Sequence, residues 1–272
     1  SLSTTVFGSG IISANSGSTL WLDRATLANT ITLSSATLQG TNGFGEILNG
    51  QITLVGSSNL TIYNYMTFNA PIVGAGSLTK LQAGVAILTA DNTYTGSTTI
   101  TAGTLRLSGS GAIASSSSVA VTGALDVSAT TTGASITTLS GAGGVNIAGK
   151  TLTITNGSST YSGVMTGAAG ALTVSGGEQI FSGANDYTGT TTVSGGTLRL
   201  TGSGTTGVAG NNLTISSAGT LAMVDANLVV NNLSLASGGV ISAPSGLSTL
   251  TANGTSSIRS EEHTSELQSP MF

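Results

Sequence analysis

An internal repeat constrains this chain more than any other feature of its sequence. The segment NTYTGSTTITAGTLRLSGSG begins at Asn92, and NDYTGTTTVSGGTLRLTGSG begins at Asn185, with 14 of the 20 positions identical. The similarity extends to both sides of these segments, and a weaker third copy lies earlier in the chain. The unit is therefore roughly 93 residues long, and self-similarity at a fixed period is typical of an array of stacked units.

Apolar and polar residues alternate within each unit. Leu105 and Leu107 alternate with Thr104 and Arg106. Further pairs follow the same pattern: Val119 and Val121, Leu125 and Val127, Leu152 and Ile154, Leu198 and Leu200, and Leu213 and Ile215. Short alternating runs bounded by Gly, Ser or Asn predict half-buried strands, and no long window has helical spacing. The chain is therefore predicted to be all-β.

Two architectures accommodate short, evenly spaced strands: an antiparallel sandwich or barrel, and a parallel solenoid. A sandwich does not usually repeat its own sequence at this period, so we expect a parallel β-helix of roughly 20–25 residues per rung. About four rungs then fill each unit, and equivalent residues of the two copies are expected to stack along the axis. Gly and Asn are expected at the corners, because they tolerate a positive φ.

The composition excludes several functional classes. Apolar residues make up 39% of the chain, which is enough to form a hydrophobic core. Only 6% of the residues are charged, so the exposed surface must consist mainly of Ser, Thr, Asn and Gly. Six Lys and Arg and a net charge of −4 do not supply the cations that nucleic-acid binding requires. No apolar run approaches about 18 residues, so no membrane insertion is expected. The absence of Cys excludes disulfides and thiolate metal sites.

The segment GSLTKLQAGVAILTADNTYTGSTTITAGTLRLSGSG resembles the autotransporter-associated β-strand repeat, a passenger-domain repeat of type V secreted proteins. The motifs that carry the resemblance are LTK, N-T-Y-T-G-x-T-T, G-T-L-x-L and a G-x-G corner; the second copy has Val174 in place of the Lys. The resemblance is close over 77–127 and 171–204, and weaker over 38–76 and 128–170. It implies a right-handed parallel β-helix on the surface of a Gram-negative bacterium, carried there by a C-terminal membrane barrel.

The expected domain organisation follows from the repeat. Residues 1–257 are predicted to form one β-helical passenger segment, with units at about 38–77, 78–171 and 172–256. Residues 258–272 concentrate ionisable side chains in an otherwise nearly uncharged chain, and we interpret them as a non-native or capping tail. Because no initiator Met or signal peptide is present, we expect a segment of a longer protein, anchored at the outer membrane through a barrel outside this chain.

The sequence offers little catalytic chemistry. A Ser-His-Asp triad requires an imidazole, and the only histidine, His263, lies in the tail. No spacing provides the three or four ligands of a zinc site, and no calcium-binding G-G-x-G-x-D motif occurs. We predict no catalytic residues, no cofactor and no metal site.

An extracellular carbohydrate-active enzyme, a polysaccharide lyase or hydrolase, is the alternative, because many β-helices have that activity. It would need two carboxylates about 5–10 Å apart on one face. The carboxylates before the tail are Asp23, Glu46, Asp91, Asp126, Glu178, Asp186 and Asp225.

Some polar and aromatic residues admit both a structural and a functional interpretation. Asp91 and Asp186 are expected to accept backbone N–H bonds at corners, and copies four rungs apart would place them roughly 20 Å from each other. Tyr94 and Tyr187 would either form a row for stacking on sugars or cover the core at a corner, and their fixed place in the repeat favours the structural role. Trp21 alternates with two leucines and is expected to face outward, where it would either cover the N-terminal end or form an exposed contact.

Three further charged residues are expected on the outer surface. Asp126 lies between two apolar residues of a strand and is predicted to point outward. Arg106 and Arg199 occupy equivalent positions in the two copies and are expected to increase solubility.

These observations predict a non-catalytic stalk or adhesive surface of a secreted, cell-surface protein. Its hydroxyl- and amide-rich exterior would offer hydrogen bonds to a glycan, to a host or neighbouring cell surface, or to a second copy of the chain. The strand edges at the ends of the coil and the low charge are the basis for expecting self-association.

Overall fold

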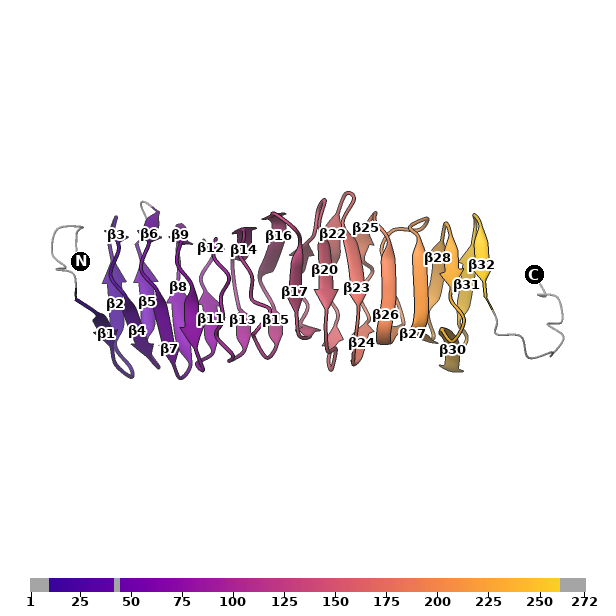
Figure 1. Ribbon diagram of the computed structural model, residues 1–272, viewed down its shortest axis with the longest axis horizontal. Coiled ribbons are helices and arrows are strands. Elements are labelled where there is room, and N and C mark those ends of the chain that lie inside the picture. The colour runs from indigo at the N-terminus through magenta and orange to yellow at the C-terminus, as the bar shows by residue number, and fades with distance from the viewer. Residues whose placement is uncertain (1–9, 42–44, 260–272) are drawn as a thin grey trace.

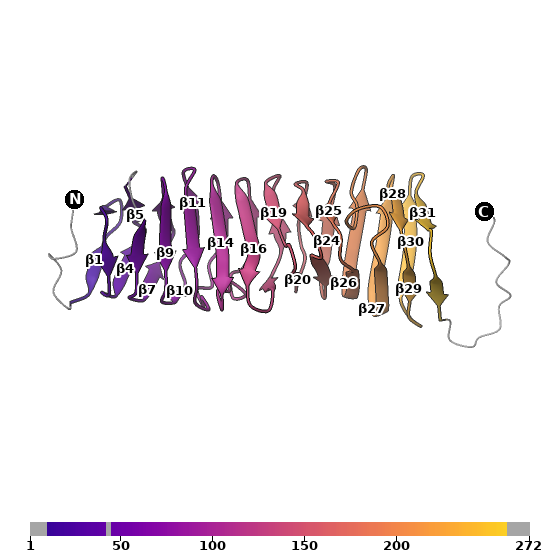
Figure 2. The same ribbon diagram turned by 90° about the horizontal axis from the view of Figure 1, so that it is seen from above.

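The computed structural model describes residues 10–41 and 45–259, which form one coil of parallel strands. Successive turns, about 12 in all, stack side by side into a rod (Figure 1). The first strand, β1 (Ile12–Ala14), and the last, β32 (Ser256–Ile258), lie at opposite ends of that rod (Figures 1 and 2). The predicted all-β parallel solenoid is confirmed.

Each turn has three sides, which we call faces 1, 2 and 3 in the order in which the chain visits them. Face 1 contains β1, β4 (Ile31–Ser34), β7 (Ile52–Val55), β10 (Ile72–Gly74), β17 (Ala134–Ile136), β20 (Thr151–Ile154), β23 (Ala171–Val174), the first parts of β26 (Thr191–Thr201) and β27 (Leu213–Val224), β29 (Leu233–Leu235) and β32.

Face 2 contains β2 (Thr19–Leu22), β5 (Thr37–Gly40), β8 (Ser58–Thr61), β11 (Leu78–Leu81), β13 (Thr98–Ile100), β15 (Val119–Val121), β18 (Leu139–Ser140), β21 (Thr160–Tyr161), β24 (Glu178–Phe181), the second parts of β26 and β27, and β30 (Val240–Ser245). Face 3 contains β3 (Thr26–Leu27), β6 (Glu46–Leu48), β9 (Tyr65–Phe68), β12 (Val85–Leu88), β14 (Thr104–Gly109), β16 (Ala124–Thr130), β19 (Gly144–Asn146), β22 (Met165–Gly167), β25 (Asp186–Tyr187), β28 (Asn227–Val230) and β31 (Thr249–Ala252).

The length of a turn lies at the short end of the predicted range. Leu78 pairs with Thr98, 20 residues later, and hydrogen bonds between side chains of successive turns have the same separation. The shortest steps join Thr19 to Thr37 and Ala134 to Leu152, and a long one near the end of the coil joins Leu233 to Ser256. Neighbouring strands lie about 4.8 Å apart, so the stack is about 55 Å long.

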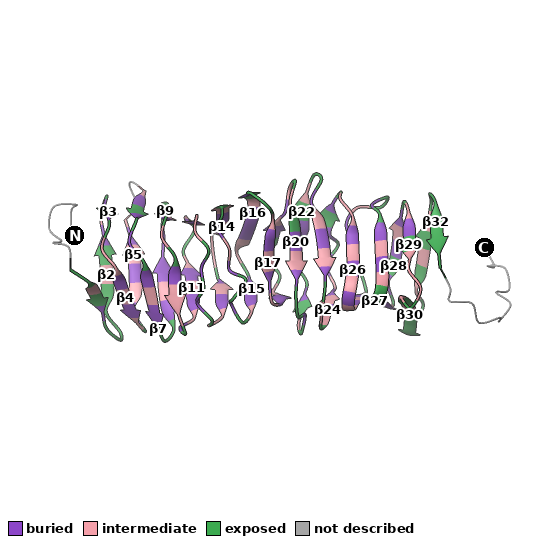
Figure 3. Ribbon diagram, viewed as in Figure 1, coloured by how far each residue is buried: buried purple, intermediate pink, exposed green. Residues whose placement is uncertain are grey.

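The core follows the period-two pattern of the sequence. Buried and partly exposed residues alternate along the strands (Figure 3), and in β14 the buried residues are Leu105 and Leu107. The other alternating pairs that the sequence singled out are buried as well. Register then stacks inward side chains into columns, as in face 2, where Leu38, Leu60 and residues 80, 100 and 121 follow one another. One continuous apolar core results.

The expected stacking of equivalent repeat residues is wrong. Leu105 lies in β14 on face 3, between β12 and β16, whereas Leu198 lies in β26 on face 2, between β24 and β27. The reason is arithmetic, because 93 residues are about four and two-thirds turns of 20 residues. Each element of the second copy therefore lies one face earlier in the turn than its counterpart.

The repeat tolerates this shift because its conserved corner contacts only the turns before and after it. Asn92 on face 1 accepts a hydrogen bond from the backbone N–H of residue 72 at 2.9 Å and donates to the carbonyl of residue 112 at 2.8 Å. Asn185 on face 3 accepts from the N–H of residue 165 at 2.9 Å and donates to the carbonyl of residue 205 at 2.8 Å. A backbone N–H in the preceding turn and a backbone carbonyl in the following turn are present on any of the three faces.

The coil continues to the end of the described residues, where Arg259 donates its backbone N–H to the carbonyl of Leu235. Residues 260–272, which include most of the predicted tail and His263, lie outside the described residues. Within residues 10–41 and 45–259, no helix is long and apolar enough to cross a bilayer.

Candidate functional site

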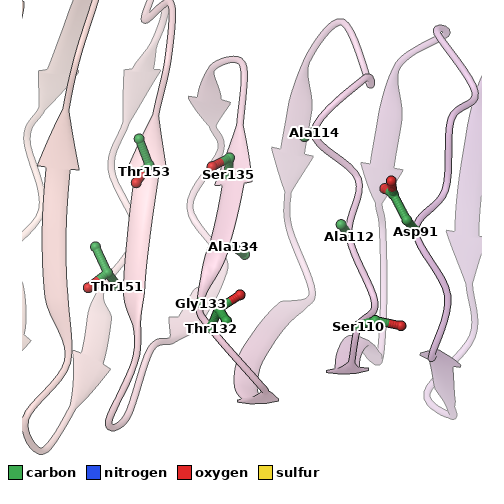
Figure 4. A pocket seen from close by; sticks show the side chains of 10 residues that line it. All are labelled: Asp91, Ser110, Ala112, Ala114, Thr132, Gly133, Ala134, Ser135, Thr151 and Thr153. Atoms are coloured by element: carbon green, nitrogen blue, oxygen red, sulfur yellow. The ribbon is translucent and has the colours of Figure 1, made fainter.

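Face 1 is interrupted near the middle of the rod. Between β10 and β17 it has no named strand, only an isolated parallel bridge between Asp91 and Ala112. A hollow of about 420 Å3 lies beside this interruption (Figure 4). It is lined by small side chains and hydroxyls: Asp91, Ser110, Ala112, Ala114, Thr132, Gly133, Ala134, Ser135, Thr151 and Thr153. Asp91 is the one carboxylate among these lining residues, so the hollow offers hydrogen bonds but not the acid–base pair of a hydrolase.

The corner role expected of Asp91 and Asp186 belongs to the asparagines beside them. Asn92 and Asn185 are nearly fully buried and bind backbone groups of both neighbouring turns, whereas both aspartates are exposed. An amide suits this corner because it accepts and donates at once, which an ionised carboxylate does not do. The two aspartates lie on different faces and form no pair.

Tyr94 and Tyr187 lie inside the core. Both are fully buried, and each hydroxyl lies 2.6 Å from a threonine hydroxyl four residues later, Thr98 or Thr191. Burial raises the pKa of both phenols, since it disfavours the phenolate. The expectation that these tyrosines have a structural role agrees with this environment. They fill the interior of the coil, however, and do not cover a corner from outside. Neither ring is available to stack on a sugar.

A column of polar side chains runs along the outside of face 3. The Arg106 Nε donates to Asp126 at 2.9 Å, and Asn146 in the next turn donates to the same carboxylate at 3.2 Å. Asp126 points outward as predicted, but its neighbours bury it almost completely. Burial acts to raise its pKa, and hydrogen bonds from Ser128 together with Arg106 outweigh that effect and lower it. Arg199 likewise forms an ion pair, with Glu178.

A buried lysine was missed by the sequence reasoning. Lys80 is 1% exposed and replaces an apolar residue in the inner column of face 2. Its Nζ donates to the carbonyls of Leu81, Gln82 and Ala102 at 2.8, 2.8 and 3.2 Å, which ties the corner after β11 to the next turn. Desolvation lowers its pKa to about 8. The alternation in LTKL was the available signal, because it places Lys80 on the inward side.

Two carboxylates meet near the first turns. The Thr41 Oγ1 lies 3.0 Å from Asp23 Oδ1 and 3.4 Å from Glu46 Oε1, so these oxygens are at most about 6.4 Å apart. That separation meets the distance criterion for a glycoside hydrolase. Glu46 also accepts from the backbone N–H of Thr41, and it is 1% exposed. Burial raises its pKa, against the hydrogen bonds that lower it. This enclosed carboxylate ties its own corner together.

Trp21 faces outward as predicted and is 53% exposed. It lines a hollow of about 300 Å3 together with Gln39, Gly40, Thr41 and Tyr63. The sequence reasoning missed Tyr63, because this residue follows β8 at a corner, where alternation no longer indicates direction. Within the described part of the chain, no group of three or more His, Cys, Asp or Glu is arranged to hold a metal ion.

Comparisons with known proteins give a match to one family model and to a curated relative. The family model of the passenger-associated-transport-repeat matches residues 78–107 and 175–200. A curated relative, the adhesin BmaC autotransporter of Brucella suis biovar 1 (strain 1330), is 35% identical over an alignment of 201 residues that covers 68% of this chain. The chain spans 6% of the length of that relative. No solved structure matches.

Proposed function

Because this chain carries the passenger-associated-transport-repeat of autotransporter proteins, we propose that it is a stretch of the passenger of such a protein, exposed on the cell surface of a Gram-negative bacterium. In this proposal the coil is a stiff, non-catalytic stalk whose outer surface takes part in adhesion. The named activity of the relative, an adhesin, supports the adhesive part.

The observation that carries the proposal is the continuous stack of turns. About 12 turns share one core and are joined by parallel ladders, so bending the rod would break hydrogen bonds and side-chain packing together. A rod about 55 Å long holds whatever precedes or follows it at a fixed distance. Stiffness of this kind is what a spacer between a cell and its target requires.

The outer surface suits weak, repeated polar contacts. Its outward residues are largely Ser, Thr, Asn and Gly, and charged residues make up only 6% of the chain. Such a surface offers hydrogen bonds without long-range repulsion, which fits a glycan, the surface of a host or neighbouring cell, or a second copy of the chain. Adhesion would then result from many such contacts along the rod.

The enzyme alternative rests on the pair formed by Asp23 and Glu46. Its spacing is suitable, but Glu46 is enclosed and bonded to the backbone of its own corner, so a substrate would meet only Asp23. A hydrolase needs both carboxylates at the scissile bond. The proposal therefore predicts no turnover of a polysaccharide panel, and turnover that disappears in Asp23→Asn and in Glu46→Gln would contradict it.

The test of the stalk is a deletion of whole turns. A surface-displayed passenger that lacks two consecutive 20-residue turns should still fold and be displayed, and an epitope placed beyond the coil should lie about 10 Å closer to the cell. Removal of ten residues, half a turn, would instead set later strands against the corners of the preceding turn and should abolish display. Unchanged binding to host cells after removal of the entire coil would refute an adhesive role while leaving the spacer role open to the distance measurement.

A further inference from the structure

The exposed aromatic side chains gather in one place. Among the described residues, three aromatic residues are substantially exposed, and they are Trp21, Tyr63 and Tyr65, at 53%, 40% and 45%. The remaining described aromatic residues are buried in the core: Phe68, Tyr94, Tyr161, Phe181 and Tyr187. A chain with so few aromatic residues would gain stability by burying these three as well. Their exposure at one end of the rod therefore calls for a reason outside the core.

The stacking of turns explains how Trp21 and Tyr63 come together. Trp21 pairs with Gln39, and Gln39 pairs with Thr61, so these three residues form an outer column on face 2. Two residues further along each of these turns lies the corner between faces 2 and 3, which brings Tyr63 beside Thr41. The hollow of about 300 Å3 that Trp21 and Tyr63 line is also lined by Gln39, Gly40 and Thr41.

The chemistry of this hollow fits a sugar ring. A pyranose has an apolar C–H face, which packs against an aromatic ring, and a rim of hydroxyl groups that require hydrogen-bond partners. Trp21 and Tyr63 provide the aromatic surfaces. The Gln39 amide has no partner among the described residues and can donate and accept. The Thr41 hydroxyl, which donates to Asp23 at 3.0 Å, keeps acceptor capacity for a sugar hydroxyl.

The charges nearby favour a neutral sugar over an acidic one. None of the five lining residues is a cation. Arg24 lies closest in sequence, and its Nε is 4.0 Å from an oxygen of Asp23, so its charge is already balanced there. The carboxylate of a sialic or uronic acid would find no cation in the hollow, and the Asp23 carboxylate beside Thr41 would repel it.

We propose that the hollow between Trp21 and Tyr63 binds one ring of a neutral glycan chain, with the ring stacked on the aromatic side chains and its hydroxyls bonded to Gln39 and Thr41. This inference rests on the proposed adhesive function and assigns it a place on the rod. The hollow is small, so it holds one sugar, and tight adhesion would come from many molecules on one cell.

Trp21 is the only tryptophan of the chain, so its fluorescence reports on this hollow alone. The purified chain is titrated with neutral oligosaccharides (gluco-, galacto- and N-acetylglucosamine oligomers) and with sialylated and galacturonic acid oligomers. At least one neutral oligomer should shift and saturate the emission, and the acidic ones should not. Tyr63→Ala should weaken that binding about tenfold, a loss of about 1.4 kcal/mol.

Tyr65→Ala is the matched control, because this equally exposed tyrosine lies two residues away and does not line the hollow. It should leave the affinity within about twofold, a difference of about 0.4 kcal/mol, and far-ultraviolet circular dichroism should show both variants folded. The proposal is overturned if no neutral oligomer saturates the signal, if Tyr63→Ala binds like the wild type, or if acidic oligomers bind as well as neutral ones.

Adhesion of the displayed chain to cells, measured alongside, separates the two levels of inference. Adhesion that persists unchanged in Tyr63→Ala while the wild type binds no sugar refutes the hollow and leaves the adhesive stalk standing. A wild type that binds a neutral oligomer but no cells refutes the adhesive role and retains the sugar site.

Discussion

The corner asparagine gives the sharpest test of how this coil is held together. Asn92 is 1% exposed, and its side chain makes three hydrogen bonds: it accepts from the Ile72 N–H at 2.9 Å and donates to the carbonyls of Ala90 and Ala112 at 2.7 and 2.8 Å. Replacement by Ala removes all three at once. The substitution should therefore destabilise the coil well beyond the effect of an average surface change.

The size of this destabilisation depends on which hydrogen bonds remain for the three backbone groups that Asn92 contacts. Both carbonyls keep a backbone donor after the substitution: the Ala112 N–H donates to the Ala90 carbonyl, and the residue 92 N–H donates to the Ala112 carbonyl. The loss of the side-chain bond at each carbonyl therefore costs only about 0.5–1.5 kcal/mol. The Ile72 N–H has no other acceptor among the described residues, and a buried orphaned donor costs about 1–3 kcal/mol. The expected loss of unfolding free energy for Asn92→Ala is therefore about 2–6 kcal/mol.

The control is Asn69→Ala. Asn69 is exposed and bonds to Asn49 at 2.8 Å and to Thr89 at 3.1 Å on the neighbouring turns, where water can replace it, so its loss should be under about 1 kcal/mol. Asn185→Ala should cost nearly as much as Asn92→Ala, because Asn185 makes matching contacts on another face. Urea unfolding followed by circular dichroism measures all three variants. Values for Asn92→Ala and Asn69→Ala within about 0.5 kcal/mol of each other would refute the reasoning.

Three further perturbations probe other parts of the coil. Tyr94→Phe removes the 2.6 Å hydrogen bond to Thr98 and should lower the unfolding free energy by about 1–2 kcal/mol in urea titrations; no change would mean that the hydroxyl is not needed there. Folding lowers the pKa of Lys80 from 10.5 to about 8. Between pH 8 and pH 10.5 the unfolded chain therefore binds one more proton at Lys80 than the folded chain does. Across that range the unfolding free energy of the wild type, measured relative to Lys80→Met, should rise by up to about 3 kcal/mol. A flat difference across that range would show that the three carbonyl bonds keep Lys80 charged. Gly141 has φ +99°, and a Cβ added there would overlap the Val121 backbone, so Gly141→Ala should lower the unfolding free energy by more than about 3 kcal/mol. Gly109 has φ +60° and open space around it, so Gly109→Ala should lower it by only about 1–2 kcal/mol in the same assay.

The fold could be predicted because its main determinants are local. Alternation in short segments such as 104–107 decides which side chains face inward, and this requires no knowledge of the partner strand. The repeat separated a stacked coil from a sandwich, and Gly and Asn indicated the corners. The outward position of Trp21 followed from the same alternation.

The candidate site was less accessible to this reasoning. The sugar hollow depends on Trp21 and Tyr63, which belong to different turns and meet only when the exact turn length is known. The same holds for Asp23 and Glu46, which are joined through Thr41. A change of one residue in the length of a turn would shift every later residue relative to the turns before it, and would separate these side chains.

The sequence by itself determined that this chain is a solenoid of short parallel strands with a continuous aliphatic core, because alternation and repetition are properties of consecutive residues. Only the tertiary structure decided on which face each copy of the repeat lies. The hydrogen bonds of the corner asparagines reach only the turns directly before and after them, so the motif forms on any face where those turns supply a backbone N–H and a carbonyl. The cumulative length of the intervening turns, which no local pattern specifies, makes the choice.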